Sequence, residues 1–252
     1  AGYAEVLREQ KFGNSRFDLL LRTAEDLCYV EVKNVTLTDE GRRAIFPDSV
    51  TVRGQKPLRE LIGLVHAGHR AAKVRPYLDA GYGVFLVGYR GYGPNPGKVT
   101  EKGLYGDAVA ALNYLKSKGI TQGRIILYGE SLGSGVAVNL AQGGRFAALV
   151  LESSFNSIAK VAQGQFPIFP VKYLVQDRYE SERKISQIDA PLLLLHGLRD
   201  RTVPIRYGRA LFALAPEPKK FIEFADAGHN DLYDHGAAAR VIAYLENRGL
   251  NP

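Results

Sequence analysis

The sequence predicts an α/β fold in which helices cover both faces of a mostly parallel sheet. Three observations carry this prediction: short apolar runs alternate with helical segments, a glycine-flanked serine follows one run, and another run of four leucines leads into a polar loop. Such alternation is typical of parallel sheets. We expect strands near 84–88, 124–128, 148–152, 192–196 and 220–224, and helices near 103–118, 133–142, 204–214 and 234–247.

The segment 155–179 interrupts this alternation. Two prolines, Pro167 and Pro170, stand there among aromatic and apolar residues. An apolar lining of this kind suits a lid or a wall for a lipid-like acyl group, and an ordinary packed connection is the alternative.

A glycine-flanked serine marks the turn after the 124–128 strand. Gly129 and Gly133 bracket Ser131 between the apolar strand and the next helical run, which is the geometry of a nucleophile elbow. A serine hydroxyl is a poor nucleophile at neutral pH, and such a turn lifts it clear of the sheet with room for a substrate and a base. Ser131 is therefore the candidate nucleophile.

A base and an acid follow at the ends of two later strands. His229 comes after the strand-like run 221–224, and Asp200 comes after the leucine run. Asp200 can orient and support an imidazolium. Taken singly, the serine can be a small residue at a helix start, the aspartate a turn former and the histidine a cap. Their joint position at three strand ends favours catalysis.

Two further residues near this set are weaker candidates. His196 ends the leucine strand beside Gly197, where packing or bracing of the loop suits it better than catalysis. Asp226 is a rival acid, but it lies in the same loop as His229, too close for the usual strand-end spacing.

From about residue 66 to residue 252 the chain resembles the alpha/beta hydrolase superfamily, and within it the small serine hydrolases of the depalmitoylase-like group. Besides the elbow, the resemblance rests on stretches in the family's order at 83–93, 103–108, 177–181, 190–192, 196–200 and 228–231. The expected fold is therefore an alpha/beta hydrolase-like sheet, in which nucleophile, acid and histidine follow one another in this order.

The resemblance implies hydrolysis of an ester, thioester or amide through an acyl-serine intermediate, with no metal and no organic cofactor. Ser131 attacks, His229 takes and returns the proton, and Asp200 holds His229. The backbone N–H of Leu132 is expected to bind the oxyanion, with a second donor from the loop at Ala67. The implied partner is a small-molecule acyl ester or thioester.

The N-terminal part has a different character. Two strands are expected near 15–21 and 28–37, the second alternating polar and apolar residues. Asp18, followed by Glu31 and Lys33, is an arrangement with which nucleases of the restriction-endonuclease type hold a divalent ion and polarise water. The alternative, which we favour, is a surface hairpin with exposed charges at alternating positions.

From about residue 10 to residue 72 this part resembles the nuclease-like domain of the sugar fermentation stimulation protein A family, whose members are linked to DNA binding. The stretches that carry the resemblance are 13–18, 29–37, 45–48 and 52–56. The resemblance covers a fragment of that family, so it implies a vestigial site at Asp18, Glu31 and Lys33. A DNA-binding or vestigial nuclease-like module is the alternative function, and an inactive fusion is a third.

The two resemblances meet at 67–71, a stretch compatible with either family. We predict a fusion of a nuclease-like fragment over 1–66 with an alpha/beta hydrolase domain over 67–252 that lacks its usual first strands. The fragment is expected to be a β-hairpin and a helix, because apolar residues from Leu58 to Val65 recur with helical periodicity. To serve the hydrolase, this segment must instead pair as a strand with 84–87. As a helix it leaves the oxyanion loop incomplete, at a cost of about 10²–10³ in turnover.

Composition sets the remaining bounds. The 252 residues are 46% hydrophobic and 23% charged, enough for a substantial core. No apolar run approaches the roughly 20 residues that span a bilayer, the first residues lack a secretory signal, and a single cysteine, Cys28, fits a reducing compartment. We therefore expect a cytoplasmic protein. The formal charge of +7 allows nucleic acid only as a weak partner, because the basic residues are spread along the chain.

Overall fold

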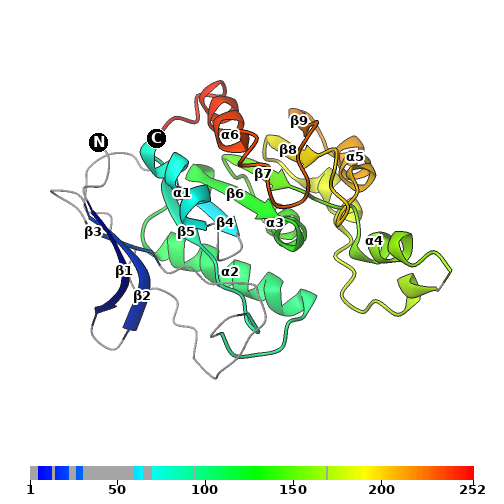
Figure 1. Cartoon of the computed structure of the whole chain (residues 1–252), viewed down its shortest axis with the longest axis horizontal. Coiled ribbons are helices and arrows are strands. Elements are labelled where there is room, and N and C mark those ends of the chain that lie inside the picture. The colour runs from blue at the N-terminus through cyan, green and yellow to red at the C-terminus, as the bar shows by residue number, and fades with distance from the viewer. Residues whose placement is uncertain are drawn as a thin grey trace.

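The computed structural model describes residues 5–12, 15–22, 27–30, 60–64, 70–92, 95–168 and 170–252. From residue 60 on, these ranges form a six-stranded sheet in the order β5-β4-β6-β7-β8-β9, and each neighbouring pair is parallel (Figure 1). The strands are β4 (Glu60–Leu64), β5 (Gly83–Leu86), β6 (Ile125–Glu130), β7 (Ala148–Glu152), β8 (Leu192–Gly197) and β9 (Lys219–Phe224). The predicted parallel sheet is confirmed.

The helices follow the strands in alternation. They are α1 (Arg70–Asp79), α2 (Glu101–Ser117), α3 (Leu132–Ala141), α4 (Ile158–Gln165), α5 (Ile205–Leu214) and α6 (Ala237–Glu246). The four predicted helices correspond to α2, α3, α5 and α6. Helix α2 begins two residues before its predicted start, where the side chain of Thr100 caps it by accepting a hydrogen bond from the backbone N–H of Gly103 at 3.1 Å.

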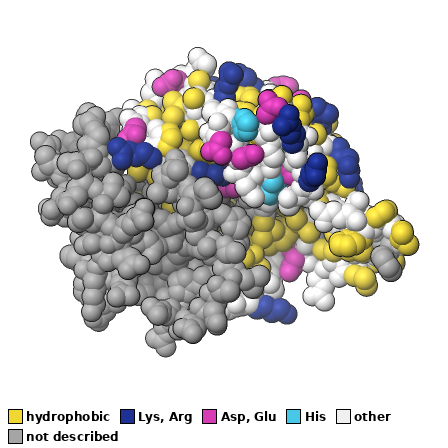
Figure 2. Space-filling view, in the orientation of Figure 1, with side chains coloured by type: hydrophobic (Ala, Val, Ile, Leu, Met, Phe, Trp, Pro, Cys, Tyr) yellow, Lys and Arg dark blue, Asp and Glu magenta, His cyan; other side chains and the backbone are white. Residues whose placement is uncertain are grey.

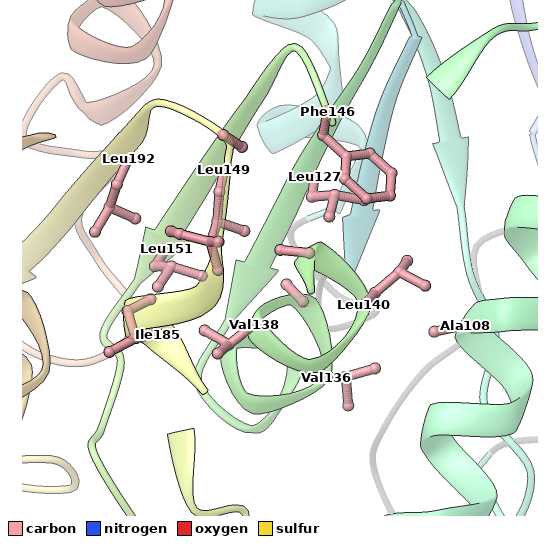
Figure 3. Close-up of a cluster of buried hydrophobic side chains, with 14 of the residues drawn as sticks. Ala108, Leu127, Val136, Val138, Leu140, Phe146, Leu149, Leu151, Ile185 and Leu192 are labelled. Carbon is pink, nitrogen blue, oxygen red and sulfur yellow. The ribbon is translucent and has the colours of Figure 1, made fainter. Parts of the chain in front are cut away.

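Helices pack on both faces of the sheet because its central strands are apolar on both faces. In β6, Ile125 and Leu127 belong to one buried cluster with side chains of α2, α3 and α5, whereas Ile126 and Tyr128 belong to a second cluster with α1 and α6. Figure 3 shows α3 against β6 and β7 in the first cluster. Strands covered on both faces read as continuous apolar runs, as the leucine run in β8 does.

The strand order identifies one rim of the sheet as a place for a site. The connection after β4 leads through α1 to β5 on one side, and the connection after β6 leads through α3 to β7 on the other side. Ligands of open parallel sheets bind outside the carboxyl ends of the strands at such a reversal. The fold therefore directs attention to the carboxyl ends of β4, β6 and their neighbours.

The helix expected from the periodicity of the segment Leu58 to Val65 does not form, and that expectation is wrong. Residues Glu60–Leu64 are strand β4, which lies between β5 and β6. Leu61 is opposite Val84 of β5 and Ile126 of β6 in the parallel register. A short apolar run is ambiguous between helix and strand, and hydrogen bonds to two neighbouring strands decide the outcome here.

An antiparallel sheet is formed by three strands near the N-terminus, β1 (Glu5–Phe12), β2 (Ser15–Arg22) and β3 (Leu27–Val30), in the order β1-β2-β3. The predicted strand at 15–21 corresponds to β2. The strand expected at 28–37 begins in β3, and its part beyond Val30 lies outside the described residues. Strand β1 was not predicted. The proposed boundary between residues 66 and 67 also lies outside the described residues and stays a prediction.

The segment 155–179 carries α4 and a short 3-10 helix, η3 (Val171–Tyr173). Four of its large apolar side chains are exposed, from 54% for Phe166 to 89% for Ile168, with Tyr173 and Leu174 both at 74%. Figure 2 shows a group of hydrophobic side chains, in yellow, in the region of α4. The role of this segment as a lid or an acyl-binding wall, with an ordinary packed connection as the alternative, stays a prediction. Among the described residues, no helix is long and apolar enough to span a bilayer.

Candidate active site

Ser131 stands alone between β6 and α3 in a strained backbone conformation. Its φ of 50° and ψ of −118° are unusual for a residue with a side chain and cost on the order of 1–3 kcal/mol. The turn is tight enough that a Cβ atom on Gly129 would lie 2.6 Å from the carbonyl oxygen of Gly133. The backbone N–H of Ser131 donates to the carbonyl oxygen of Glu152 at the end of β7, at 2.9 Å, and this bond holds the turn on the neighbouring strand.

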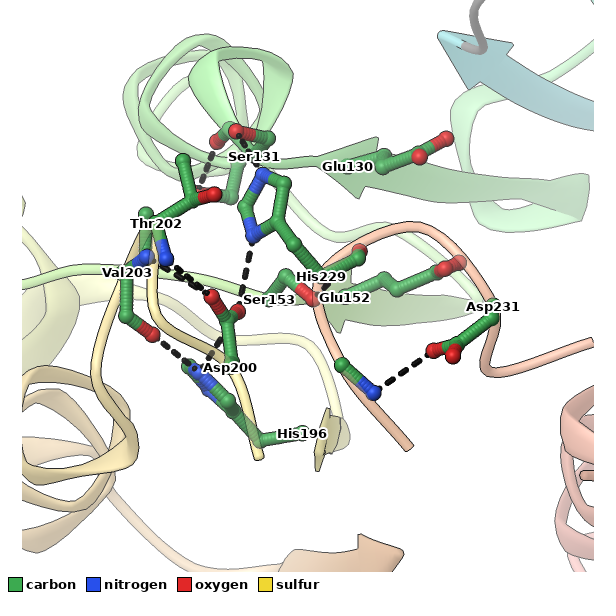
Figure 4. A network of polar contacts seen from close by, with 12 residues as sticks. Glu130, Ser131, Glu152, Ser153, His196, Asp200, Thr202, Val203, His229 and Asp231 are labelled. Atoms are coloured by element: carbon green, nitrogen blue, oxygen red, sulfur yellow. Dashed lines mark hydrogen bonds and ion pairs between the residues drawn. The ribbon is translucent and has the colours of Figure 1, made fainter. Parts of the chain in front are cut away.

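Three side chains from separate strand ends form one hydrogen-bonded chain (Figure 4). The Oγ atom of Ser131 lies 2.9 Å from Nε2 of His229, and Nδ1 of His229 lies 2.7 Å from Oδ2 of Asp200. An ionised carboxylate can only accept, so Nδ1 carries the proton and Nε2 is free to accept from the serine hydroxyl. This is the hydrogen-bond order that a serine nucleophile needs.

Asp200 is held as an anion at the end of β8. Its Oδ1 atom accepts from the backbone N–H groups of Thr202 at 2.9 Å and Val203 at 2.8 Å. Burial alone raises the pKa of this carboxyl group, but hydrogen bonds from His196 and His229 and the backbone outweigh burial, so the pKa of Asp200 lies well below its ordinary value. Asp226, the rival acid, is instead exposed and paired with Arg199.

A family model described as the sugar fermentation stimulation protein RE domain matches residues 1–77. An uncharacterized protein of Mycobacterium tuberculosis is 43% identical over 152 residues, which are 60% of this chain and 54% of that protein. The human alpha/beta hydrolase domain-containing protein 17B is 37% identical over 154 residues, which are 61% of this chain and 52% of that protein. The chain thus spans about half the length of the curated relatives it matches.

Solved structures resemble the part that carries the six-stranded sheet. An alpha-beta hydrolase from Vibrio vulnificus matches with a TM-score of 0.60 and 22% identity, over 73% of this chain and 72% of that one. An esterase domain of a Rhodothermus marinus protein matches with a TM-score of 0.60 and 19% identity, over 79% and 90%. For a monoacylglycerol lipase of Paleococcus ferrophilus the values are 0.57 and 18%, over 75% and 94%.

The described residues from 60 to 252 have the alpha/beta hydrolase fold. Sequence identities of 18–22% to these solved structures support a shared fold, but they do not identify a substrate. In this fold the serine of the elbow follows a central strand, and here that strand is β6. The N-terminal likeness to the sugar fermentation stimulation protein family is likewise supported, by the match over 1–77.

Of the two expected oxyanion donors, Leu132 lies within the described residues and Ala67 does not. Leu132 is the first residue of α3, and the first N–H groups of a helix have no partner within the helix. Ala67 lies outside the described residues, so its role stays a prediction.

The N-terminal candidates remain untested. Asp18 lies on β2, whereas Glu31 and Lys33 lie outside the described residues. No group of three or more His, Cys, Asp or Glu side chains that could hold a metal ion occurs in the part of the chain that the structure describes. The vestigial nuclease-like site and DNA binding stay predictions.

Sequence reasoning missed a second buried group of polar side chains, which we call the lysine cluster. Its members are Lys73, Tyr77, Tyr128, Glu130, Glu152 and Tyr233. The Nζ atom of Lys73 lies 2.9 Å from Oε1 of Glu130 and 3.2 Å from Oε1 of Glu152. The hydroxyl of Tyr128 donates to the other oxygen of Glu152, and the three tyrosine hydroxyls form a chain with O–O distances of 2.8 and 3.1 Å.

A sequence signal for this cluster existed in the last residues of two apolar strands. Glu130 and Glu152 are the charged ends of β6 and β7, and both are buried. Carboxylates are almost never fully buried unless they are paired. A charged residue at the end of an apolar strand is therefore expected to be paired with an opposite charge. Here the opposite charge is Lys73 of α1.

Proposed function

We propose that this chain is a serine hydrolase that cleaves a carboxylic ester or thioester through an acyl-serine intermediate. The observation that carries the proposal is the hydrogen-bonded chain from Ser131 through His229 to Asp200 at the carboxyl rim of the sheet. The strained elbow and the fold shared with esterases and a lipase support it.

The proposed reaction has two halves. In the first, the Oγ atom of Ser131 attacks the carbonyl carbon of the substrate while Nε2 of His229 takes the hydroxyl proton. The proton then passes from His229 to the departing alcohol or thiol, which leaves an ester bond to Ser131. In the second half, water attacks this ester, His229 again takes a proton, and the acid product leaves as the proton returns to Ser131.

Asp200 and the start of α3 stabilise the charges of this reaction. The carboxylate of Asp200 keeps the proton of neutral His229 on Nδ1 and favours the imidazolium that forms when Nε2 accepts a second proton. The backbone N–H of Leu132 is the proposed first oxyanion donor, and one such donor contributes roughly 2.7–4 kcal/mol. The second is proposed at Ala67, in the loop that follows β4.

Competent activity is favoured over impaired activity by strand β4. The segment before the oxyanion loop pairs with β5 and β6, as the hydrolase requires, and does not form a separate helix. The substrate is a small-molecule ester or thioester, and the exposed apolar segment around α4 is a candidate contact for its acyl group.

Covalent labelling by a fluorophosphonate probe tests the proposal. Such a probe reacts with a serine only where a base and an oxyanion site activate it. The folded protein should be labelled, and Ser131→Ala should abolish labelling. Ser117→Ala, at the end of α2, is the matched control and should label like the parent chain. Folded parent protein that stays unlabelled would sink the assignment.

A further inference from the structure

His196 is the fourth hydrogen-bond donor to the carboxylate of Asp200. It ends β8 with no exposed side-chain area, and its Nε2 atom lies 3.3 Å from Oδ2 of Asp200. The same oxygen accepts from Nδ1 of His229 at 2.7 Å. With Thr202 and Val203 on Oδ1, each oxygen of the carboxylate has two donors (Figure 4).

The proton of His196 is located by its second contact. Nε2 lies 2.7 Å from the carbonyl oxygen of Val203, which can only accept, so Nε2 must carry a proton. That proton is shared between the carbonyl oxygen of Val203 and Oδ2 of Asp200. His196 therefore holds both ends of the short turn from Asp200 to Val203, and it does so from the strand side.

The other ring nitrogen of His196 faces a close-packed helix. Its Nδ1 atom is buried and has no hydrogen-bond partner within the described part of the chain. A Cβ atom at Gly208 of α5 would lie 2.5 Å from Nδ1, so the helix can approach the ring this closely only because residue 208 is glycine. The ring therefore serves as a hydrogen-bond donor through Nε2 alone, since Nδ1 has no acceptor within reach in the described part of the chain.

The charged groups around the ring agree with this assignment. Asp200 lies in the loop after β8, and His229 lies beyond it at 2.7 Å from the shared oxygen. Glu223 of β9 is opposite His196 in the strand register, but its carboxylate is engaged by Arg209 at 2.8 and 2.9 Å. Asp200 is thus the carboxylate that the Nε2–H group of His196 contacts.

We propose that His196 is a positioning residue for the reaction. Its Nε2–H holds Oδ2 of Asp200 toward His229, and it weakens the electrostatic effect of the carboxylate on His229. This inference rests on the proposed function. It assigns a role in the site to His196, although a buried histidine at the end of a strand can also serve only to pack the core.

Two substitutions distinguish a role of His196 as a hydrogen-bond donor from a role in packing alone. His196→Phe keeps a ring of similar size and removes the proton donor. His196→Gln restores a donor, because the amide Nε2 of glutamine is the same number of bonds from the backbone as Nε2 of histidine. The readouts are kcat and KM for p-nitrophenyl butyrate and the rate of fluorophosphonate labelling between pH 5 and pH 9, with thermal unfolding as the check of folding.

The proposal predicts a specific pattern. His196→Phe should lose about 10- to 100-fold in kcat with little change in KM, the size expected for one hydrogen bond to a charged group. Because the full carboxylate charge then acts on the imidazolium of His229, the acid limb of the labelling rate should move to higher pH. His196→Gln should recover most of kcat and return the limb toward its original position.

Three results would overturn the proposal in folded protein: an unchanged kcat in His196→Phe, an acid limb that stays in place or moves to lower pH, or a glutamine variant no better than phenylalanine. The parent chain distinguishes this failure from failure of the proposed function. If the parent is not labelled at Ser131, the function fails, whereas a labelled parent with an indifferent His196 removes only the positioning role.

Discussion

Two buried polar groups lie at the carboxyl rim of the same sheet, and they differ in how their carboxylates are satisfied. Ser131 and the lysine cluster's Glu130 are neighbours in sequence, yet the side chains of Glu130 and Glu152 point away from the imidazole of His229 (Figure 4). Asp200 has four donors for its two oxygens. Oε2 of Glu130 has no hydrogen-bond partner in the described part of the chain.

The pKa values of Asp200 and Glu152, one carboxyl group from each site, are shifted in opposite directions. Burial raises the pKa of Asp200, but its donors reverse the effect and leave the pKa lowered. Burial also raises the pKa of Glu152, and the negative charge of Glu130 raises it further, while Lys73 and Tyr128 offset only part of this. Burial raises the pKa of both carboxyl groups, and the donors around Asp200 and the like charge beside Glu152 account for the opposite net directions.

The two groups are also joined through the backbone. The carbonyl oxygen of Glu152 accepts the N–H of Ser131 at 2.9 Å, and the next residue, Ser153, donates its hydroxyl to the carbonyl oxygen of His229 at 3.2 Å. Ser153, like Ser131, has a positive φ, of 49°. The lysine cluster thus anchors the strand end from which both the serine and the histidine are held.

The largest effect is expected from Asp200→Asn. The amide keeps the size of the side chain but removes the charge and favours the wrong tautomer of His229, so kcat/KM should fall about 10³–10⁴-fold while the protein stays folded. Ester hydrolysis under steady-state conditions measures this. Asp226→Asn is the control, since that exposed carboxylate is paired with Arg199, and it should stay within about two-fold of the parent. Equal losses in the two variants would make Asp226 a serious rival for the acid.

The second effect is on stability. Lys73→Met keeps the aliphatic stem and removes the cation that faces Glu130 and Glu152, leaving two buried carboxylates close together without a counter-charge from Lys73. Breaking a buried ion pair on one side costs about 3–5 kcal/mol, and urea unfolding at pH 7.5 should show a loss of this size in the free energy of unfolding.

The matched control for the lysine is an exposed pair. Arg145 and Asp189 lie 3.1 Å apart with side chains 83% and 65% exposed, so Arg145→Met should cost less than about 1 kcal/mol. A loss as small in Lys73→Met would mean that the cluster gains little from its cation, and the contrast with the exposed pair would disappear.

Much of the hydrolase-fold part could be predicted because its central strands β6, β7 and β8 are largely apolar. The runs that became β6, β8 and β9 fix where three strands end, and the residues just after them, Ser131, Asp200 and His229, come together at one rim. Chain order and strand ends were sufficient for this. Their role in a reaction stays a proposal until labelling tests it.

Other features could not be predicted because they depend on partners distant in sequence. The periodicity of Leu58 to Val65 favours a helix, and only the neighbours β5 and β6 make Glu60–Leu64 a strand. The contact of His196 with Asp200 depends on how the turn to Val203 folds back onto β8. Lys73 contacts Glu152, which lies 79 positions away in the sequence. No local sequence pattern in α1 predicts that contact.

The smallest effect is expected from Glu152→Gln, and it concerns the sign of a pH dependence. Since the folded pKa of Glu152 is raised above its ordinary value of 4.5, the folded protein binds this proton more tightly than the unfolded chain does. As pH rises above 4.5 and through the raised pKa, this group lowers the free energy of unfolding. Glutamine does not titrate, so the variant's free energy of unfolding, minus the parent's, should become more positive between pH 4.5 and pH 7.5 in urea titrations.

Asp200→Asn provides the opposite sign for comparison. The folded pKa of Asp200 is lowered from 3.8, so the stability that its charge contributes is fully present above that value and is lost as pH falls toward the folded pKa. The part of the difference that comes from the titration of Asp200 itself should therefore stay constant from pH 4.5 to pH 7.5 and shrink only below pH 3.8. If the Glu152→Gln difference is also flat between pH 4.5 and pH 7.5, Glu152 ionises without penalty, and the contrast between a buried carboxylate with four donors and one beside a like charge fails.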